Sequence, residues 1–181
     1  MKHLVLLALL ALAASAGAQA PKSGIDYAPQ YKTDNDSKEW EELQNVPPPA
    51  FPTEETLQRI DVGPAATNKY YVDLATLALG DDGIVRYVLV VNTAGGAINV
   101  SFEGMHCATR SWKHYATGRY DTKAWTVSRA ARQEWRPIEN KANNPHHAVL
   151  SRSFFCPQGN PITSADDGRN ALRMGKHPNS V

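Results

Sequence analysis

The sequence predicts an α+β domain in which an antiparallel β-meander packs against a C-terminal helix, with one disulfide joining the two. Three observations lead to this expectation. Strand-length apolar segments separated by short Gly/Asp turns run from about residue 57 to residue 127, helical spacing of apolar residues begins after Pro145, and the chain contains two cysteines, Cys107 and Cys156. With 181 residues, 42% of them hydrophobic and 20% charged, the composition suits one globular domain with tails.

The first twenty residues resemble a secretory signal peptide. Lys2 and His3 precede an apolar core at residues 4–14, and small residues follow it. We assign residues 1–18 to the signal peptide, with cleavage after Ala20 as the alternative. The core is shorter than the about 20 residues that a membrane span needs. We therefore expect a periplasmic protein without a transmembrane segment in its mature part, with secretion or surface exposure as alternatives.

The next segment, residues 19–56, is an acidic arm that contains proline. Between residues 26 and 55 it has eight acidic residues against two lysines, and residues 47–49 are three consecutive prolines that favour an extended path. The arm either lies across the domain, with Trp40 as an anchor, or is a solvated tail. The domain itself is expected over residues 57–176, followed by a short tail at 177–181.

Strands are expected from residue 70 to 74, 84 to 91, 98 to 107, 112 to 120 and 125 to 127. The segment 84–91 is apolar on both faces except at Arg86, which is typical of a central strand covered on both sides. In the next segment, Val100 and Phe102 lie on one face, and Ser101 and Glu103 lie on the other. The apolar positions change phase at Gly104, which predicts a β-bulge there.

The period changes from strand to helix after Pro145. Val149, Leu150 and Phe154 fall at helical spacing, and this helix is expected to end near Cys156. A second helix is expected to begin at Ser164, which is followed by two acidic residues, and to end near Gly175.

The two cysteines form an even pair in what we expect to be an oxidising compartment, so a structural disulfide between Cys107 and Cys156 is favoured. A redox-active thiol is the alternative. The chain has no C-x-x-C motif, and bulky Phe154 and Phe155 precede Cys156.

Known catalytic and cofactor motifs are absent from the sequence, and we expect no cofactor. The formal net charge of +1 argues against a strongly basic nucleic-acid-binding protein. His146 and His147 are the candidates for a metal site or for hydrolytic catalysis. Adjacent helical residues point about 100° apart, which is unfavourable for joint binding of one metal ion, so no metal site is predicted.

A basic segment with interleaved aromatic residues is the main candidate for binding. Residues 105–152 carry nine basic residues against three acidic ones. The candidate binding residues are Arg110, Trp112, Lys113, Tyr115, Arg119 and Trp125. They either bind an envelope protein or polymer, with nucleic acid not expected, or are neutralised internally by the acidic arm.

Several segments resemble the cryptic neisserial protein-like family of exported proteobacterial proteins. They are Gly83-Ile-Val-Arg-Tyr-Val-Leu-Val-Val, Gly96-Ala-Ile-Asn-Val-Ser-Phe-Glu-Gly-Met-His-Cys, Trp135-Arg-Pro-Ile and His146-His-Ala-Val-Leu. The order of these elements is more distantly similar to the surface-adhesin protein E-like family. That likeness implies a sheet packed on a disulfide-linked helix, and some members of that family bind host matrix proteins. Neither resemblance supplies catalytic residues.

These observations lead us to expect an exported, non-enzymatic binding protein of the cell envelope that uses a face of its sheet or its basic and aromatic residues. One alternative is an adhesin-like surface protein that binds matrix proteins. Another is a small periplasmic hydrolase or metal protein that uses His146 or His147.

Overall fold

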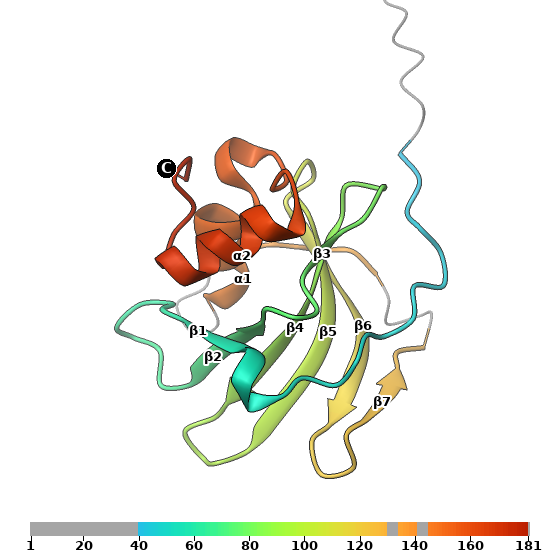
Figure 1. The fold of residues 1–181 in the computed structure, drawn as a ribbon, viewed down its shortest axis with the longest axis vertical. Helices are drawn as coiled ribbons and strands as arrows, with labels where there is room; N and C mark the ends of the chain where they lie inside the picture. The colour runs from blue at the N-terminus through green and yellow to red at the C-terminus, as the bar shows by residue number, and fades with distance from the viewer. Residues whose placement is uncertain (1–39, 130–133, 141–144, 181) are drawn as a thin grey trace, which may run out of the picture. The chain divides into compact units, whose positions relative to one another are not determined.

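The computed structural model of the chain describes residues 40–129, 134–140 and 145–180 (Figure 1). The expected signal peptide and residues 19–39 of the arm lie outside these ranges. In the described part, an eight-stranded antiparallel sheet is followed by helical segments near the C-terminus. No helix in this part is both long enough and apolar enough to cross a membrane.

The sheet is a meander, as predicted. Its strands are β1 (Leu57–Ile60), β2 (Lys69–Asp73), β3 (Ala78–Leu79), β4 (Val85–Asn92), β5 (Ile98–His106), β6 (Ser111–Arg119), β7 (Ala124–Val127) and β8 (Arg136–Pro137). The order across the sheet is β1-β2-β4-β5-β6-β7, while β3 pairs with β4 and β8 pairs with β6. Connections of four or five residues join β4 to β5, β5 to β6 and β6 to β7, and such short connections suit antiparallel neighbours.

Both faces of the central part of the sheet are buried, and different parts of the chain cover them. On one face, Val85, Tyr87 and Leu89 of β4 belong to a core that includes the C-terminal helical segments. On the other face, Val88 and Val90 belong to a second core, against which residues of the arm pack. The expectation that residues 84–91 form a central strand covered on both sides is therefore confirmed.

The C-terminal helical segments are α1 (His146–Val149), a π-helix (Leu150–Phe155), a 3-10 turn (Pro157–Gly159) and α2 (Ala165–Met174). We predicted a regular helix up to Cys156, but its second half is wider, with Cys156 N donating to the Ser151 carbonyl five residues earlier at 2.9 Å. In a π-helix, residues four and five apart share a face, which lets both Phe154 and Phe155 be buried beside Leu150.

Helix α2 follows its local signals. Asp167 N donates to the Ser164 side chain at the N-cap, and Gly175 closes the helix with a left-handed φ of 78°. The packed chain continues to His177, which is 3% exposed and whose backbone N donates to the Ser153 carbonyl at 2.7 Å.

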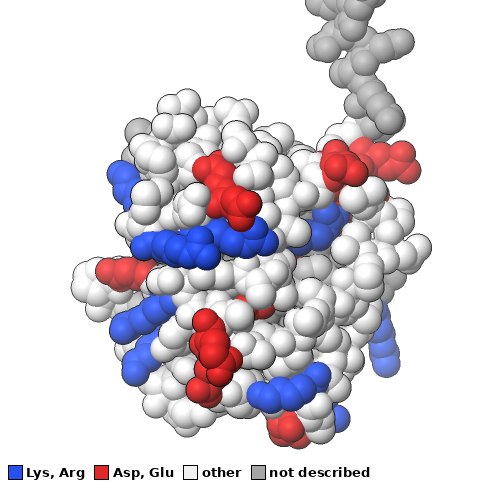
Figure 2. All heavy atoms as spheres, in the orientation of Figure 1, with Lys and Arg blue, Asp and Glu red and all other residues white. Residues whose placement is uncertain are grey.

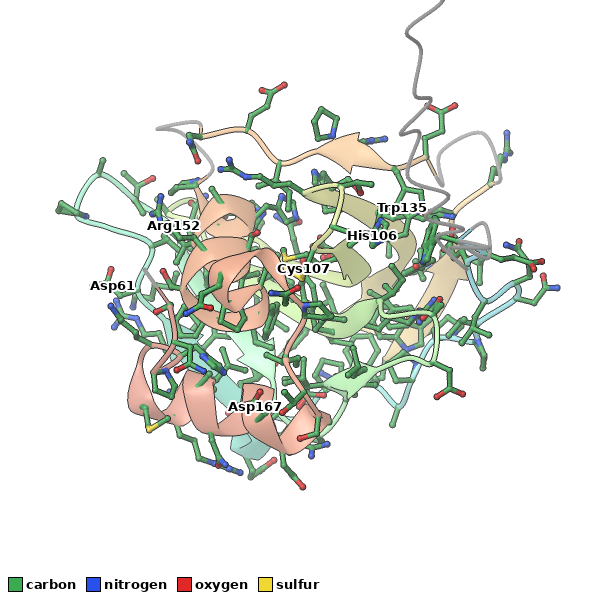
Figure 3. All side chains as sticks on the ribbon, turned by 90° about the horizontal axis from the view of Figure 1, so that it is seen from above. Asp61, His106, Cys107, Trp135, Arg152 and Asp167 are labelled. Carbon is green, nitrogen blue, oxygen red and sulfur yellow. A yellow bond between two sulfur atoms is a disulfide. The ribbon has the colours of Figure 1, made fainter. Side chains whose placement is uncertain are left out.

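The expected disulfide is present between Cys107, directly after β5, and Cys156, directly after the π-helix. The two Sγ atoms are 2.07 Å apart. Figure 3 shows Cys107 between the strands and the helical segments. The bond therefore fixes the C-terminal helical segments to the centre of the sheet.

The β-bulge predicted at Gly104 is wrong in its position. Gly104 pairs regularly with Arg86 on β4 and Lys113 on β6, and the shift in register falls between Phe102 and Glu103, opposite Tyr115 of β6. The apolar positions of β5 change face because its two ends meet different cores. A Cβ atom at Gly104 would lie 2.7 Å from the Tyr115 ring, so the glycine provides room for that ring.

Candidate functional site

A cavity of about 620 Å³ lies on the helix-covered face of the sheet, beside the start of α1. Leu89 and Val91 of β4, Ser101 and Glu103 of β5, and Trp112 of β6 line its sheet side. His146 and His147 of α1 line a second side, and residues 136–139 complete the lining. The pocket therefore combines an apolar surface with a few polar groups, which is typical of small-molecule sites.

Glu103 is the central polar residue of this pocket, and it is 4% exposed. Its carboxylate accepts hydrogen bonds from Ser101 Oγ at 2.7 Å, Tyr87 Oη at 3.1 Å and His147 Nε2 at 2.8 Å. The strand geometry brings these groups together, because Ser101 lies two residues before Glu103 on the same face and Tyr87 is its partner on β4. Glu103 thus has donors on both carboxylate oxygens.

The surroundings of Glu103 keep it ionised. Burial by itself would raise its pKa, but the charge and hydrogen bond of His147, with smaller contributions from His146 and Ser101, outweigh burial and lower the pKa to about 2. Burial and the nearby Glu103 charge raise the pKa of Tyr87 well above its ordinary value, so Tyr87 remains a hydrogen-bond donor. The carboxylate of Glu103 and the Nε2 atom of His147 thus form a buried pair at the wall of the pocket.

The two histidines have different environments. The His147 ring stacks on Trp112 with centroids 3.8 Å apart, and the His146 ring stacks on Tyr70 at 4.9 Å. Burial, followed by the charge of His147, lowers the pKa of His146 to about 4, so that its imidazole is neutral at physiological pH. His146 Nδ1 is buried and has no hydrogen-bond partner among the described residues.

Arg136 of β8 contributes a positive charge to the same pocket. Its guanidinium carbon lies 5.5 Å from the centroid of the Trp112 ring, and the side chain is exposed. In the described ranges, no cluster of three or more His, Cys, Asp or Glu side chains is arranged to hold a metal ion. The arrangement is therefore suited to binding a polar organic molecule or to acid–base chemistry by His147.

The six predicted binding residues do not form one surface. Trp112 lies in the pocket, Arg119 is exposed beside Asp121, and Arg110 donates to Asn140 Oδ1 at 3.0 Å. Trp125 donates to the Pro49 carbonyl at 2.8 Å. Figure 2 shows that basic and acidic side chains are interspersed on the visible face of the molecule, without one large basic patch.

The remaining two, Lys113 and Tyr115, lie beneath the arm and bind its residue Glu42. Lys113 Nζ donates to both carboxylate oxygens of Glu42 at 3.0 and 2.8 Å. Tyr115 Oη donates at 2.9 Å and Trp135 Nε1 at 3.0 Å. We call these three donors the Glu42 socket. The contact between the acidic arm and the basic segment, one of the two interpretations from sequence, is thus present at this point.

Trp40 anchors the start of the described arm beside the socket. Its ring stacks on His106 with centroids 4.3 Å apart, and its Nε1 donates to the Asp82 carbonyl at 2.8 Å. Trp135 meets the same Trp40 ring edge-on at 6.0 Å, and Figure 3 shows His106 and Trp135 close together.

Sequence reasoning identified the histidines of the pocket but missed Glu103, which was placed on the polar face of its strand. A signal for its burial was available in the neighbouring strand. Residues 84–91 are apolar on both faces, so the strand paired with them is expected to be covered on both faces as well. A buried carboxylate on such a strand needs hydrogen-bond partners, and His147, already a candidate site residue, is one of them.

A known protein family matches most of the chain. Residues 35–173 match the model of the CNP1-like family (cryptic neisserial protein 1). No curated protein and no solved structure matches the chain significantly. The more distant likeness to the surface-adhesin protein E-like family therefore stays a prediction.

Proposed function

We propose that this chain, which belongs to the CNP1-like family, is an exported cell-envelope protein that binds a small ligand in the pocket beside Glu103. The family match covers all pocket residues, which lie between Leu89 and His147.

The observation that carries the proposal is the buried Glu103–His147 pair at the wall of a cavity. A buried carboxylate is a poor source of stability, since removing its charge from water is costly and hydrogen bonds offset only part of that cost. Ionisable groups with shifted pKa values that line a pocket are instead common at functional sites. The volume of about 620 Å³ falls within the range of small-molecule sites.

Export is supported by two features of the chain. The first eighteen residues have the pattern of a signal peptide. The Cys107–Cys156 disulfide suits an oxidising compartment such as the periplasm.

Hydrolysis is the second candidate, because a histidine held by a carboxylate is the usual base of hydrolytic sites. Its weakness is the nucleophile. The Ser101 hydroxyl donates to Glu103, so a water molecule would have to be the group that His147 activates. Binding needs no such additional component and is therefore the favoured function.

In-cell photo-crosslinking tests the proposal. A photoreactive amino acid replaces Arg136 at the edge of the pocket or, as a control, Val127, which is 59% exposed on β7. We expect a mass adduct on the mature periplasmic protein from position 136 only. Equal adducts from both positions, or none from position 136, would contradict the proposal. Recovery of a cleaved form of the adduct would favour hydrolysis instead.

A further inference from the structure

The arm is held on the domain by a specific contact that a second copy of the chain can supply equally well. We propose that two copies exchange their arms, so that Glu42 of one copy occupies the Glu42 socket of the other and Trp40 stacks on the other copy's His106. This exchange concerns the arm alone and is independent of the pocket beside Glu103.

The contact selects the side chains that it binds. The Trp40 ring stacks on His106, and the Glu42 carboxylate accepts hydrogen bonds from all three donors of its socket. The side chains of Glu42 and Lys113 are only 10% and 12% exposed, so this ion pair is largely removed from water. Like charges are strongly unfavourable in such a place, and the socket therefore requires a carboxylate at this position.

The same segment buries little apolar surface. Trp40 is 43% exposed and Leu43 is 46% exposed. Apolar burial is the main driving force for tight association, so residues 40–43 are held chiefly by polar and ring contacts. Val46 and Phe51, which pack against the second core, lie further along the chain. Residues 40–43 can therefore leave the domain while the cover of that core stays in place.

The turn at Gln44 and Asn45 is suited to be the hinge of an exchange. Asn45 has a left-handed φ of 55°, and residues 42–48 border a cavity of about 410 Å³. The three prolines at 47–49 follow directly and favour an extended path. Short hinges under strain favour exchange, because opening the turn straightens the chain and lets the arm reach a second copy. Two copies that exchange arms in the same way form a closed, symmetric dimer.

The attachment of the arm to its own domain competes with exchange. A short flexible connection holds the arm near its own socket at an effective concentration in the millimolar range. Both arrangements contain the same contacts, so the wild-type protein should be monomeric at micromolar concentrations. Exchange should dominate when the contact within one copy is made unfavourable.

Charge reversal in the full mature chain tests the proposal. Glu42→Lys and Lys113→Glu each bring like charges together within one copy, whereas in a mixture each arm matches the socket of the other chain. We expect each variant alone to be monomeric. Their mixture should double its molar mass in light scattering at about 0.1 mM, which is below the effective concentration of an attached arm. The double variant Glu42→Lys/Lys113→Glu is the matched control, and it should stay monomeric when it is mixed with the wild-type chain.

A mixture of the two single variants that stays monomeric would contradict the proposal, and so would the same mass increase in the control. If the Lys113 socket of Glu42→Lys binds a synthetic peptide of residues 40–44 while the mixture stays monomeric, the surface takes a segment of another protein and arm exchange is wrong. Deletion of residues 44–45 gives a second test if a charge reversal prevents folding. The shortened hinge keeps the arm from its own socket, so a dimer supports the proposal and a monomer contradicts it.

Discussion

The neutral state of His146 predicts a specific loss of stability in mild acid. Its pKa is lowered from 6.5 to about 4, by burial first and by the charge of His147 second. The unfolded chain therefore takes up a proton at this position at a higher pH than the folded protein does. The stabilisation is complete above pH 6.5 and is lost as the pH falls towards 4.

The size of the effect follows from the two pKa values. The difference between 6.5 and about 4 corresponds to about 3 kcal/mol of unfolding free energy in total. At pH 5 the same relation gives a loss of about 2 kcal/mol relative to pH 8. His146→Phe keeps an aromatic ring against Tyr70 and removes the titrating group, so it should remove this part of the pH dependence.

Urea unfolding at pH 8 and pH 5 measures the effect. Between these pH values, the unfolding free energy of the wild-type protein should fall by about 2 kcal/mol more than that of His146→Phe. The values at pH 8 serve as the internal control, because His146 is then neutral in both folded and unfolded chains. Parallel decreases in the two proteins would refute the argument. The contribution of Glu103, whose pKa is about 2, is lost at lower pH, between its ordinary value of 4.5 and about 2.

Three further predictions concern the packing around the site. Replacing both cysteines of the Cys107–Cys156 disulfide by alanine should lower the unfolding free energy by about 4 kcal/mol, as expected for a closed loop with a sequence separation of 49 residues, and urea unfolding measures the loss. Glu42→Gln should speed amide hydrogen exchange in residues 40–46, because it removes the charge that the Glu42 socket binds. The control Glu41→Gln, at an exposed neighbouring residue, should leave the exchange unchanged. Equal exchange in both variants would mean that the Glu42 socket does not hold the arm. Gly104→Ala should lower the unfolding free energy by about 1–3 kcal/mol, because the new methyl group meets the Tyr115 ring. In the control Gly95→Ala the nearest atom is 3.9 Å from the new Cβ, so the loss of unfolding free energy in the same assay should be clearly smaller.

The elements that local signals determine were predicted well from sequence. Strand β4 follows from its continuous apolar run, and α2 follows from the Ser164 N-cap and Gly175. These signals act over a few residues, so they can be read without knowing the tertiary structure. The Cys107–Cys156 bond was predicted because the chain offers one pairing.

The features that the sequence did not reveal depend on which segment covers which face. The change of apolar face along β5 was interpreted as a bulge at Gly104, because nothing local shows that two separate cores meet the strand. The π-helix likewise depends on burying Phe154 and Phe155 together. Glu103 was assigned to the polar face of its strand for the same reason, although it is paired with a histidine 44 residues later in the chain.

The two covered faces of the sheet have a consequence for how the chain folds. The contact between Glu42 and Trp135 spans 93 residues, and the contact between Glu103 and His147 spans 44. Figure 1 shows the arm crossing the strands, with the helical segments gathered in another part of the molecule. Neither face can be covered by residues that are near in sequence. Each long loop must therefore lose conformational entropy before its ends gain stabilising contacts, and this slows folding.

Trimming the chain at either end should therefore not yield a smaller stable domain. Removal of residues 40–56 would leave Val88, Val90 and Phe102 without part of their cover. Removal of the chain after residue 145 would uncover Tyr87 and Leu89. Each truncated sheet would present a broad apolar surface to water, and such surfaces self-associate. The smallest unit that folds on its own therefore extends from the arm to the last helix.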